Sequence, residues 1–101
     1  MSYKVKTTPK FLKQLKKLAK KYPSIKNDLL ILEKELLDEP RLGDPIFSNC
    51  YKIRLAIKSK GRGKSGEARI ITYVYVENES IYLLDIYDKS EQTTISLTQL
   101  K

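Results

Sequence analysis

The sequence contains no histidine and no tryptophan, and it has only one cysteine and four glycines in 101 residues. The absence of histidine excludes the commonest acid–base group, any Ser–His or Cys–His nucleophile pair and most catalytic zinc sites. A single cysteine, Cys50, cannot form an internal disulfide, which is typical of a protein in a reducing compartment. We expect Cys50 to be structural, and any catalysis to use Lys, Arg, Tyr, Asp or Glu without a metal or organic cofactor.

Long apolar runs are also missing. No stretch of the sequence is long and apolar enough to span a membrane, and the N-terminus lacks the pattern of a signal peptide. We therefore expect a cytoplasmic protein with no membrane partner. Hydrophobic residues make up 41% of the chain, which is enough for a packed core, and the length fits one domain over residues 1–101.

Positive charge is abundant and unevenly distributed. The formal net charge is +8. Residues 1–26 contain nine lysines and no acid, residues 27–48 contain six acids, and residues 51–69 contain seven basic residues and one acid, Glu67. This pattern favours a polyanionic partner such as nucleic acid, although a cationic surface that serves only solubility is the alternative.

Two helices are expected in the first half of the chain. Thr8 followed by Pro9 is typical of a helix N-terminus. Apolar residues then recur at helical spacing, and Pro23 interrupts the pattern before a second helix that ends ahead of Pro40. The predicted buried stripes are Phe11, Leu15 and Leu18 in the first helix, and Ile25, Leu29, Leu32 and Leu36 in the second.

The remainder of the chain predicts strands. A short strand at residues 3–7 precedes the helices, and strands at 51–57, 68–76 and 81–87 follow a loop at 41–49. Residues 93–100 fit a short strand or a short helix. The expected fold class is therefore α+β, in which an opening strand and a two-helix hairpin precede an antiparallel β-sheet meander, with the helices on one face of the sheet.

The stretch SKGRGKSGEAR at residues 59–69 contains the Gly-Lys-Ser ending of a phosphate-binding Walker loop. A Walker loop also needs a glycine five residues earlier, where this sequence has Lys58, and a helix afterwards, where this sequence predicts a strand. Both departures exclude the nucleotide loop. We interpret the stretch as a basic hairpin loop between two strands.

Alternation in the strand at 51–57 places Lys52 and Arg54 on the face opposite its apolar residues, and Lys58 continues the same spacing. The density of positive charge favours an anion-binding face over one that only faces solvent. In the first helix, lysines such as Lys13, Lys17 and Lys20 form either a solvated face or a contact with RNA. We expect Tyr51 and Tyr73 to lie in the core rather than to stack on bases.

Three segments carry a resemblance to a known family: CYKIRL at residues 50–55, KSKGRGKSGEARIITYV at 58–74 and IYLLDIYDKSEQ at 81–92. They resemble the RelE/ParE superfamily of toxin–antitoxin toxins, nearest the RelE/HigB-like branch, and the order of elements matches over nearly the whole chain. The resemblance implies a RelE-like fold and a type II toxin that acts as a ribosome-dependent mRNA endoribonuclease. It also implies a cognate antitoxin protein and the ribosome with its messenger as partners.

Site residues follow from the same resemblance, position by position. Lys52 and Arg54 match basic residues that contact RNA and assist proton transfer, Arg69 matches an arginine near the scissile phosphate, and Lys89 matches a lysine late in the last strand. The family pattern has a further arginine and a tyrosine where this chain has Ser90 and Ser96, so we assign the phenol to Tyr87. The expected RNA-binding residues, from the basic loop and the first helix, are Lys58, Lys60, Arg62, Lys64, Lys13, Lys17 and Lys20.

Two alternatives stay open at this point. ParE-like members of the superfamily share the fold but inhibit DNA gyrase by binding and cleave no RNA. An inactive, RNA-binding relative would keep the basic face without the chemistry. The basic strand face together with Lys89 favours the nuclease, since an inhibitor that acts by binding needs no residues for phosphate cleavage.

Overall fold

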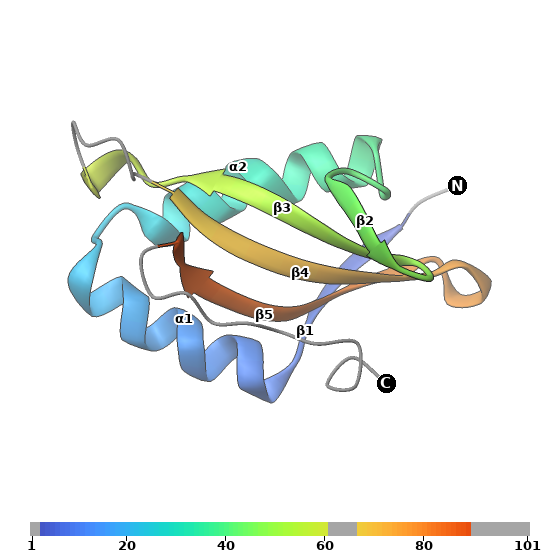
Figure 1. Cartoon of the computed structure of the whole chain (residues 1–101), viewed down its shortest axis with the longest axis horizontal. Helices are drawn as coiled ribbons and strands as arrows, with labels where there is room; N and C mark the ends of the chain where they lie inside the picture. Colours follow the sequence, from blue (N-terminus) through green and yellow to red (C-terminus); the bar gives the residue numbers. More distant parts are fainter. Residues whose placement is uncertain (1–2, 61–66, 90–101) are drawn as a thin grey trace.

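The computed structural model describes residues 3–60 and 67–89, with Lys60 described by its backbone alone. Two helices and five strands succeed one another in this part of the chain (Figure 1). The α+β fold class is confirmed. The elements are β1 (Lys4–Thr7), α1 (Pro9–Lys21), α2 (Ile25–Asp38), β2 (Asp44–Phe47), β3 (Cys50–Ala56), β4 (Glu67–Tyr75) and β5 (Ser80–Asp88), with 3₁₀ turns η1 (Lys58–Lys60) and η2 (Val76–Asn78).

The strands form one sheet in the order β1-β5-β4-β3-β2. β3, β4 and β5 make the expected antiparallel meander, whereas β1 joins the sheet by pairing parallel to β5. One expectation is wrong: part of the predicted 41–49 loop is the edge strand β2, which pairs antiparallel with β3. Pro45 is compatible with this position because an edge strand need not donate every backbone N–H to the sheet.

Both helices begin and pack as their sequence patterns predict. The Oγ1 atom of Thr8 accepts a hydrogen bond from the backbone N–H of Phe11 at 3.2 Å, and Pro9 occupies the first turn of α1. The predicted stripes of α1 and α2 are buried, while the α1 lysines face outward. Burial of one apolar stripe per helix fixes which side of each helix faces the sheet.

The hydrophobic core lies between the helices and one face of the sheet. The apolar stripes of α1 and α2 pack there against inward-facing strand residues that include Ile53, Leu55, Ile70, Ile81 and Ile86. α1 packs against β5, and α2 contacts β1 and β3 (Figure 1). Because side chains alternate along a strand, the residues between these core positions point to the opposite side, which we call the outer face.

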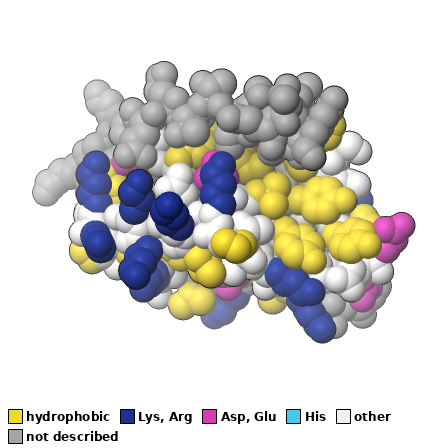
Figure 2. Space-filling view, turned by 90° about the horizontal axis from the view of Figure 1, so that it is seen from below, with side chains coloured by type: hydrophobic (Ala, Val, Ile, Leu, Met, Phe, Trp, Pro, Cys, Tyr) yellow, Lys and Arg dark blue, Asp and Glu magenta, His cyan; other side chains and the backbone are white. Residues whose placement is uncertain are grey.

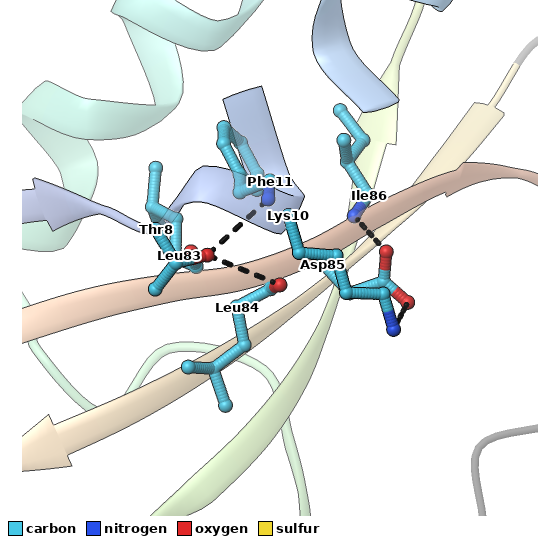
Figure 3. A network of polar contacts seen from close by, with 7 residues as sticks. All are labelled: Thr8, Lys10, Phe11, Leu83, Leu84, Asp85 and Ile86. Atoms are coloured by element: carbon cyan, nitrogen blue, oxygen red, sulfur yellow. Dashed lines mark hydrogen bonds and ion pairs between the residues drawn. The ribbon is translucent and has the colours of Figure 1, made fainter. Parts of the chain in front are cut away.

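A bulge in β5 decides which of its residues reach the outer face. Ile71 of β4 pairs with Asp85, but the next residue, Thr72, pairs with Leu83, so Leu84 is an extra residue in β5. The hydroxyl of Thr8 donates a hydrogen bond to the Leu83 carbonyl oxygen at 3.0 Å, which joins the start of α1 to the bulge (Figure 3). An extra residue exchanges the two faces of a strand, and Leu83 is therefore in the core.

Near this bulge, Lys10 lies with its Nζ atom 3.6 Å from Oδ2 of the buried Asp85 (Figure 3). The other carboxylate oxygen of Asp85 accepts a hydrogen bond from the backbone N–H of Ile86 at 2.9 Å. A buried carboxylate is costly unless it is paired and hydrogen-bonded. Asp85 is thus hydrogen-bonded at one oxygen, whereas its Oδ2 atom has the ion pair with Lys10 and no hydrogen bond among the described residues.

The end of β3 is fastened to α2 by a polar contact. The buried Asp28 accepts hydrogen bonds at Oδ2 from the Ser24 hydroxyl (2.7 Å) and from the backbone N–H of Lys58 (3.1 Å). The backbone N–H of Ser59 donates to the Ser24 oxygen at 2.8 Å. These bonds fix the position at which the chain enters the basic stretch after β3.

Candidate nucleic-acid interface

Strand pairing brings three of the predicted site residues into one row across the sheet. Arg54 of β3 pairs with Arg69 of β4, and Arg69 pairs with Tyr87 of β5. Paired residues on neighbouring antiparallel strands point to the same face. All three side chains therefore stand on the outer face, and we call them the Arg54–Arg69–Tyr87 row.

Two further predicted residues flank this row. Lys52 is two positions before Arg54 on β3, on the same face, and it is half-buried. Lys89 directly follows β5 and is exposed. The predicted catalytic residues Lys52, Arg54, Arg69, Tyr87 and Lys89 are thus all at the outer face or its margin, although they come from three strands.

Glu67 is a member of this cluster that the sequence analysis missed. Its Oε1 atom lies 2.6 Å from an Nη atom of Arg69, in an ion pair whose side chains are 34% and 13% exposed. A hydrogen bond from Arg69 is the largest cause that lowers the pKa of Glu67, and the charges of Arg69, Lys89 and Arg54 lower it further. The i, i+2 spacing on a strand was a signal for this pair, because it places Glu67 and Arg69 on one face.

Tyr87 has the opposite electrostatic environment. Burial raises the pKa of its phenol, and the charge of Asp85 raises it as well, while Arg69 counteracts both in part. The phenol therefore keeps its proton near neutral pH and is able to donate a hydrogen bond. The neutral phenol of Tyr87 thus lies beside the positively charged Arg69, which in turn forms an ion pair with Glu67.

The predicted RNA-binding residues lie elsewhere on the surface. Lys13, Lys17 and Lys20 are exposed on α1, where Figure 2 shows a field of basic side chains. Lys58 is exposed in η1, next to β3. The side chain of Lys60, the loop residues Arg62 and Lys64, and the positions Ser90 and Ser96 lie outside the described residues, as does the stretch 93–100.

Tyr51 and Tyr73 are less buried than predicted, whereas Cys50 is buried as expected of a structural residue. Neither Tyr51 nor Tyr73 belongs to the core. The Tyr51 hydroxyl accepts a hydrogen bond from Arg41 at 2.9 Å, and Tyr73 stands on the outer face against other tyrosines. Cys50 is buried, and burial raises the pKa of its thiol, which suits a structural residue rather than a nucleophile.

A groove runs between α2 and β3. Two adjoining cavities of about 390 and 260 Å³ share Leu32, Glu35 and Arg54 in their walls. Lys52 and Asp44 line one cavity, and Lys58 and Asp28 line the other, so the groove combines apolar wall residues with both basic and acidic ones. Within residues 3–60 and 67–89, no acidic or cysteine cluster is placed to hold a metal ion, and no helix has the length and apolar character to cross a membrane.

No protein-family model matches the sequence. The fold matches solved structures of toxins of toxin–antitoxin systems. The chain is 21% identical to a double arginine-to-alanine mutant of the E. coli toxin RelE in complex with a peptide of its antitoxin, with 95% of this chain and 99% of that chain covered and a TM-score of 0.66. For the intact E. coli RelBE toxin–antitoxin complex the identity is 21%, the coverage is 85% and 95%, and the TM-score is 0.57. This likeness confirms the RelE-like fold that the sequence predicts.

Proposed function

We propose that this protein is the toxin of a type II toxin–antitoxin system and acts in the cytoplasm as a ribosome-dependent mRNA endoribonuclease. The observation that carries the proposal is the Arg54–Arg69–Tyr87 row, because it joins two guanidinium groups to a neutral phenol on the outer face of the sheet. Cleavage of RNA by its own 2′-hydroxyl needs charge stabilisation at the phosphorus, an acid for the leaving 5′-oxygen and an acceptor for the 2′-hydroxyl proton. The row offers the first two without histidine or metal.

The row suggests a division of roles. Arg69 and Arg54 would neutralise the charge that develops on the phosphorane, since preorganised cations stabilise such a transition state more than the ground state. Arginine cannot release its proton near neutral pH, so its role is electrostatic. Tyr87, held in its neutral form, would donate its proton to the 5′-oxygen of the leaving nucleotide. Lys52 and Lys89 would add positive charge around the messenger, and the proton of the attacking 2′-hydroxyl would pass to a water molecule of the solvent.

Dependence on the ribosome agrees with the shape of this site. The row lies on a sheet face, and its first member, Arg54, is exposed. Such a surface has little means of aligning the 2′-oxygen, the phosphorus and the leaving oxygen by itself. A ribosome that holds the messenger in position would supply this alignment, which is a large part of the barrier for an unoriented substrate.

Induced expression followed by mapping of messenger 5′ ends on translating ribosomes tests the proposal. We expect new 5′ ends within translated messages soon after induction, together with growth arrest. Binding to ribosomes should weaken steeply with salt, because each phosphate contact releases condensed counterions. Growth arrest without new ends, accompanied by loss of DNA supercoiling activity, would favour the gyrase-inhibitor alternative instead.

Replacement of Glu67 by glutamine is expected to strengthen binding of short single-stranded RNA. The change removes the carboxylate that pairs with Arg69, so the guanidinium is free to contact a phosphate. One added phosphate contact should make the slope of log K against log salt steeper by about 0.7. Fluorescence anisotropy of a labelled RNA measures both quantities.

The pH dependence provides a control for the Glu67 variant. Because the pKa of Glu67 is lowered in the folded protein, its charge is lost only as the pH falls through that lowered value. The wild type and the Glu67→Gln variant should therefore converge in acid and differ most near neutral pH. An equal difference at every pH would show that the carboxylate charge is not responsible.

A cognate antitoxin is the proposed protein partner. Two of the solved RelE structures contain the toxin with an antitoxin chain or peptide, and the apolar wall residues of the groove between α2 and β3 suit a segment with apolar anchors. β2 pairs with β3 only as far as Lys52, so among the described strands none covers that edge of residues 53–56. An added strand has room to pair there.

The substitution Ile31→Glu tests this partner site. Ile31 lines the groove and is 44% exposed, so its replacement should leave folding intact while it puts a carboxylate where an apolar anchor of the partner would pack. We expect the complex with a protein encoded next to the toxin to weaken by at least about tenfold, as for a lost interface anchor of 1.4 kcal/mol or more. Leu30→Glu, which is 56% exposed and does not line these cavities, is the matched control. Equal capture of the partner by both variants would place the antitoxin elsewhere.

A further inference from the structure

Three tyrosines form a second cluster on the outer face of the sheet. Tyr73 of β4 and Tyr82 of β5 are paired in register, with ring centroids 6.5 Å apart and planes 30° apart. Tyr75 continues the line, with its ring 6.3 Å from that of Tyr73 and a 23° angle between the planes. We call these residues the tyrosine row. The ring of Tyr73 therefore stacks with a tyrosine ring on each of two sides.

The tyrosine row is part of the surface and not of the core. Its neighbours in sequence, Val74 and Ile81, are fully buried on the helix side, and alternation turns the tyrosines away from them. Tyr75 is 37% exposed. Figure 2 shows hydrophobic side chains gathered at this end of the molecule, apart from the basic field over α1. An aromatic pair across two strands commonly stabilises a sheet, and this role would explain two of the rings. The third ring is not explained by such a pair.

The position of Tyr82 depends on the β5 bulge. Without the extra residue Leu84, strict alternation from Ile86 would place Tyr82 toward the core and Leu83 toward the outer face. The Thr8 hydroxyl and the Lys10–Asp85 contact hold the bulge in place (Figure 3). The β5 bulge therefore places the side chain of Tyr82 on the outer face, beside Tyr73.

Cations border the row on its β1 side. Lys6 is paired in parallel register with Tyr82, and its Nζ atom lies 5.8 Å from the centroid of the Tyr82 ring. Lys4, paired with Ser80, points to the same face. Glu77, in the η2 turn that joins β4 to β5, would repel a phosphate and so limits the surface at that end of the two strands. Aromatic rings beside lysines match a nucleic acid strand, in which bases stack on the rings and phosphates pair with the amines.

We propose that the tyrosine row together with Lys4 and Lys6 binds single-stranded RNA by base stacking. It is a site of its own, because the buried Ile71 and Asp85 separate it from the Arg54–Arg69–Tyr87 row on the same face. The identity of the RNA, as messenger or ribosomal RNA, rests on the proposed function. The binding of single-stranded RNA to the row does not depend on that function. The row would hold RNA at a distance from the cleavage site without taking part in the chemistry.

Binding of a labelled, unstructured RNA dodecamer to the full chain, measured by fluorescence anisotropy at low salt, tests the proposal. Leucine at position 73, 75 or 82 removes the ring but keeps apolar bulk, and each change should weaken binding by about 5- to 100-fold, as for one lost base stack. Tyr73→Phe and Tyr82→Phe keep the ring and should stay within about twofold. Tyr51→Leu, a half-buried tyrosine outside the row, is the matched control. Because Tyr75 is the most exposed ring of the three, Tyr75→Leu reports on the row even if the other variants lose stability.

The outcomes separate this inference from the proposed function. Wild-type protein that does not bind the dodecamer, or leucine variants that bind as well as the wild type, would overturn the inference. Leucine variants that keep RNA affinity but lose the antitoxin would identify the row as a protein interface, which also overturns it. If binding depends on the row while no messenger ends appear on expression, the inference stands and the nuclease proposal fails.

Discussion

Replacement of Arg69 by alanine is expected to reduce messenger cleavage on the ribosome by about 10²–10³-fold, the usual loss when one preorganised donor is removed from a transition state. Arg69 occupies the centre of the Arg54–Arg69–Tyr87 row, with one partner on each neighbouring strand. Its side chain is only 13% exposed, and the ion pair with Glu67 fixes its direction. Ribosome binding, which is spread over many charges, should change little.

Three companion variants make this result interpretable. Arg69→Lys keeps the charge but loses the two-pronged geometry of the guanidinium, so cleavage should recover only in part. Lys52→Ala and Lys89→Ala should cause smaller losses, because both residues flank the row. Primer extension on a translated reporter message measures all four proteins. Intact cleavage by Arg69→Ala, with abolished cleavage by Lys52→Ala or Lys89→Ala, would move the central role away from Arg69.

Local periodicity was sufficient to predict the helices and the central strands. A helix with one apolar stripe has one way to face a core, and Phe11, Leu15 and Leu18 are buried as predicted. In the strand after Cys50, Ile53 and Leu55 alternate with Lys52 and Arg54, so the basic outer face could also be inferred from sequence. Both signals act over a few residues, which is why the sequence alone reveals them.

Features that depend on pairing between distant strands were not accessible in the same way. The edge strand β2 contains Pro45 and follows Gly43, two residues typical of loops, and it exists because β3 offers it a partner. Parallel pairing of β1 with β5 joins residues about 76 positions apart. No local pattern specifies such a contact.

In the candidate site, too, local features could be predicted from the sequence and features that depend on strand pairing could not. The sequence suggested Arg54 and Arg69 separately, but only the β3–β4 register sets them opposite each other. Tyr73 was wrongly expected in the core because β4 buries residues on both faces, Ile70 on one and Ile71 on the other, which obscures the alternation. Tyr82 depends in addition on the β5 bulge, and the sequence gives no local signal for it.

Replacement of Gly43 by alanine is expected to destabilise the protein by about 2–4 kcal/mol, which combines a strained backbone with a steric clash. Gly43 has a φ of +104°, a region that residues with a side chain rarely adopt. An added Cβ would also lie 2.6 Å from the carbonyl oxygen of Lys52 and 2.8 Å from Cγ1 of Ile53. The carbonyl belongs to β3 and cannot move without disturbing the strand that positions Lys52 and Arg54.

Urea unfolding followed by circular dichroism measures this loss as a lower midpoint with an unchanged slope. Ser48→Ala, an exposed change in the connection between β2 and β3, is the matched control and should stay within about 0.5 kcal/mol of the wild type. Because Gly43 and Lys52 also line the groove beside α2, surviving Gly43→Ala protein should bind the antitoxin less tightly. A midpoint equal to that of the wild type would mean that the segment before β2 shifts away from β3 at little cost. In that case the close approach of Gly43 is not what holds β2 at the edge of the sheet.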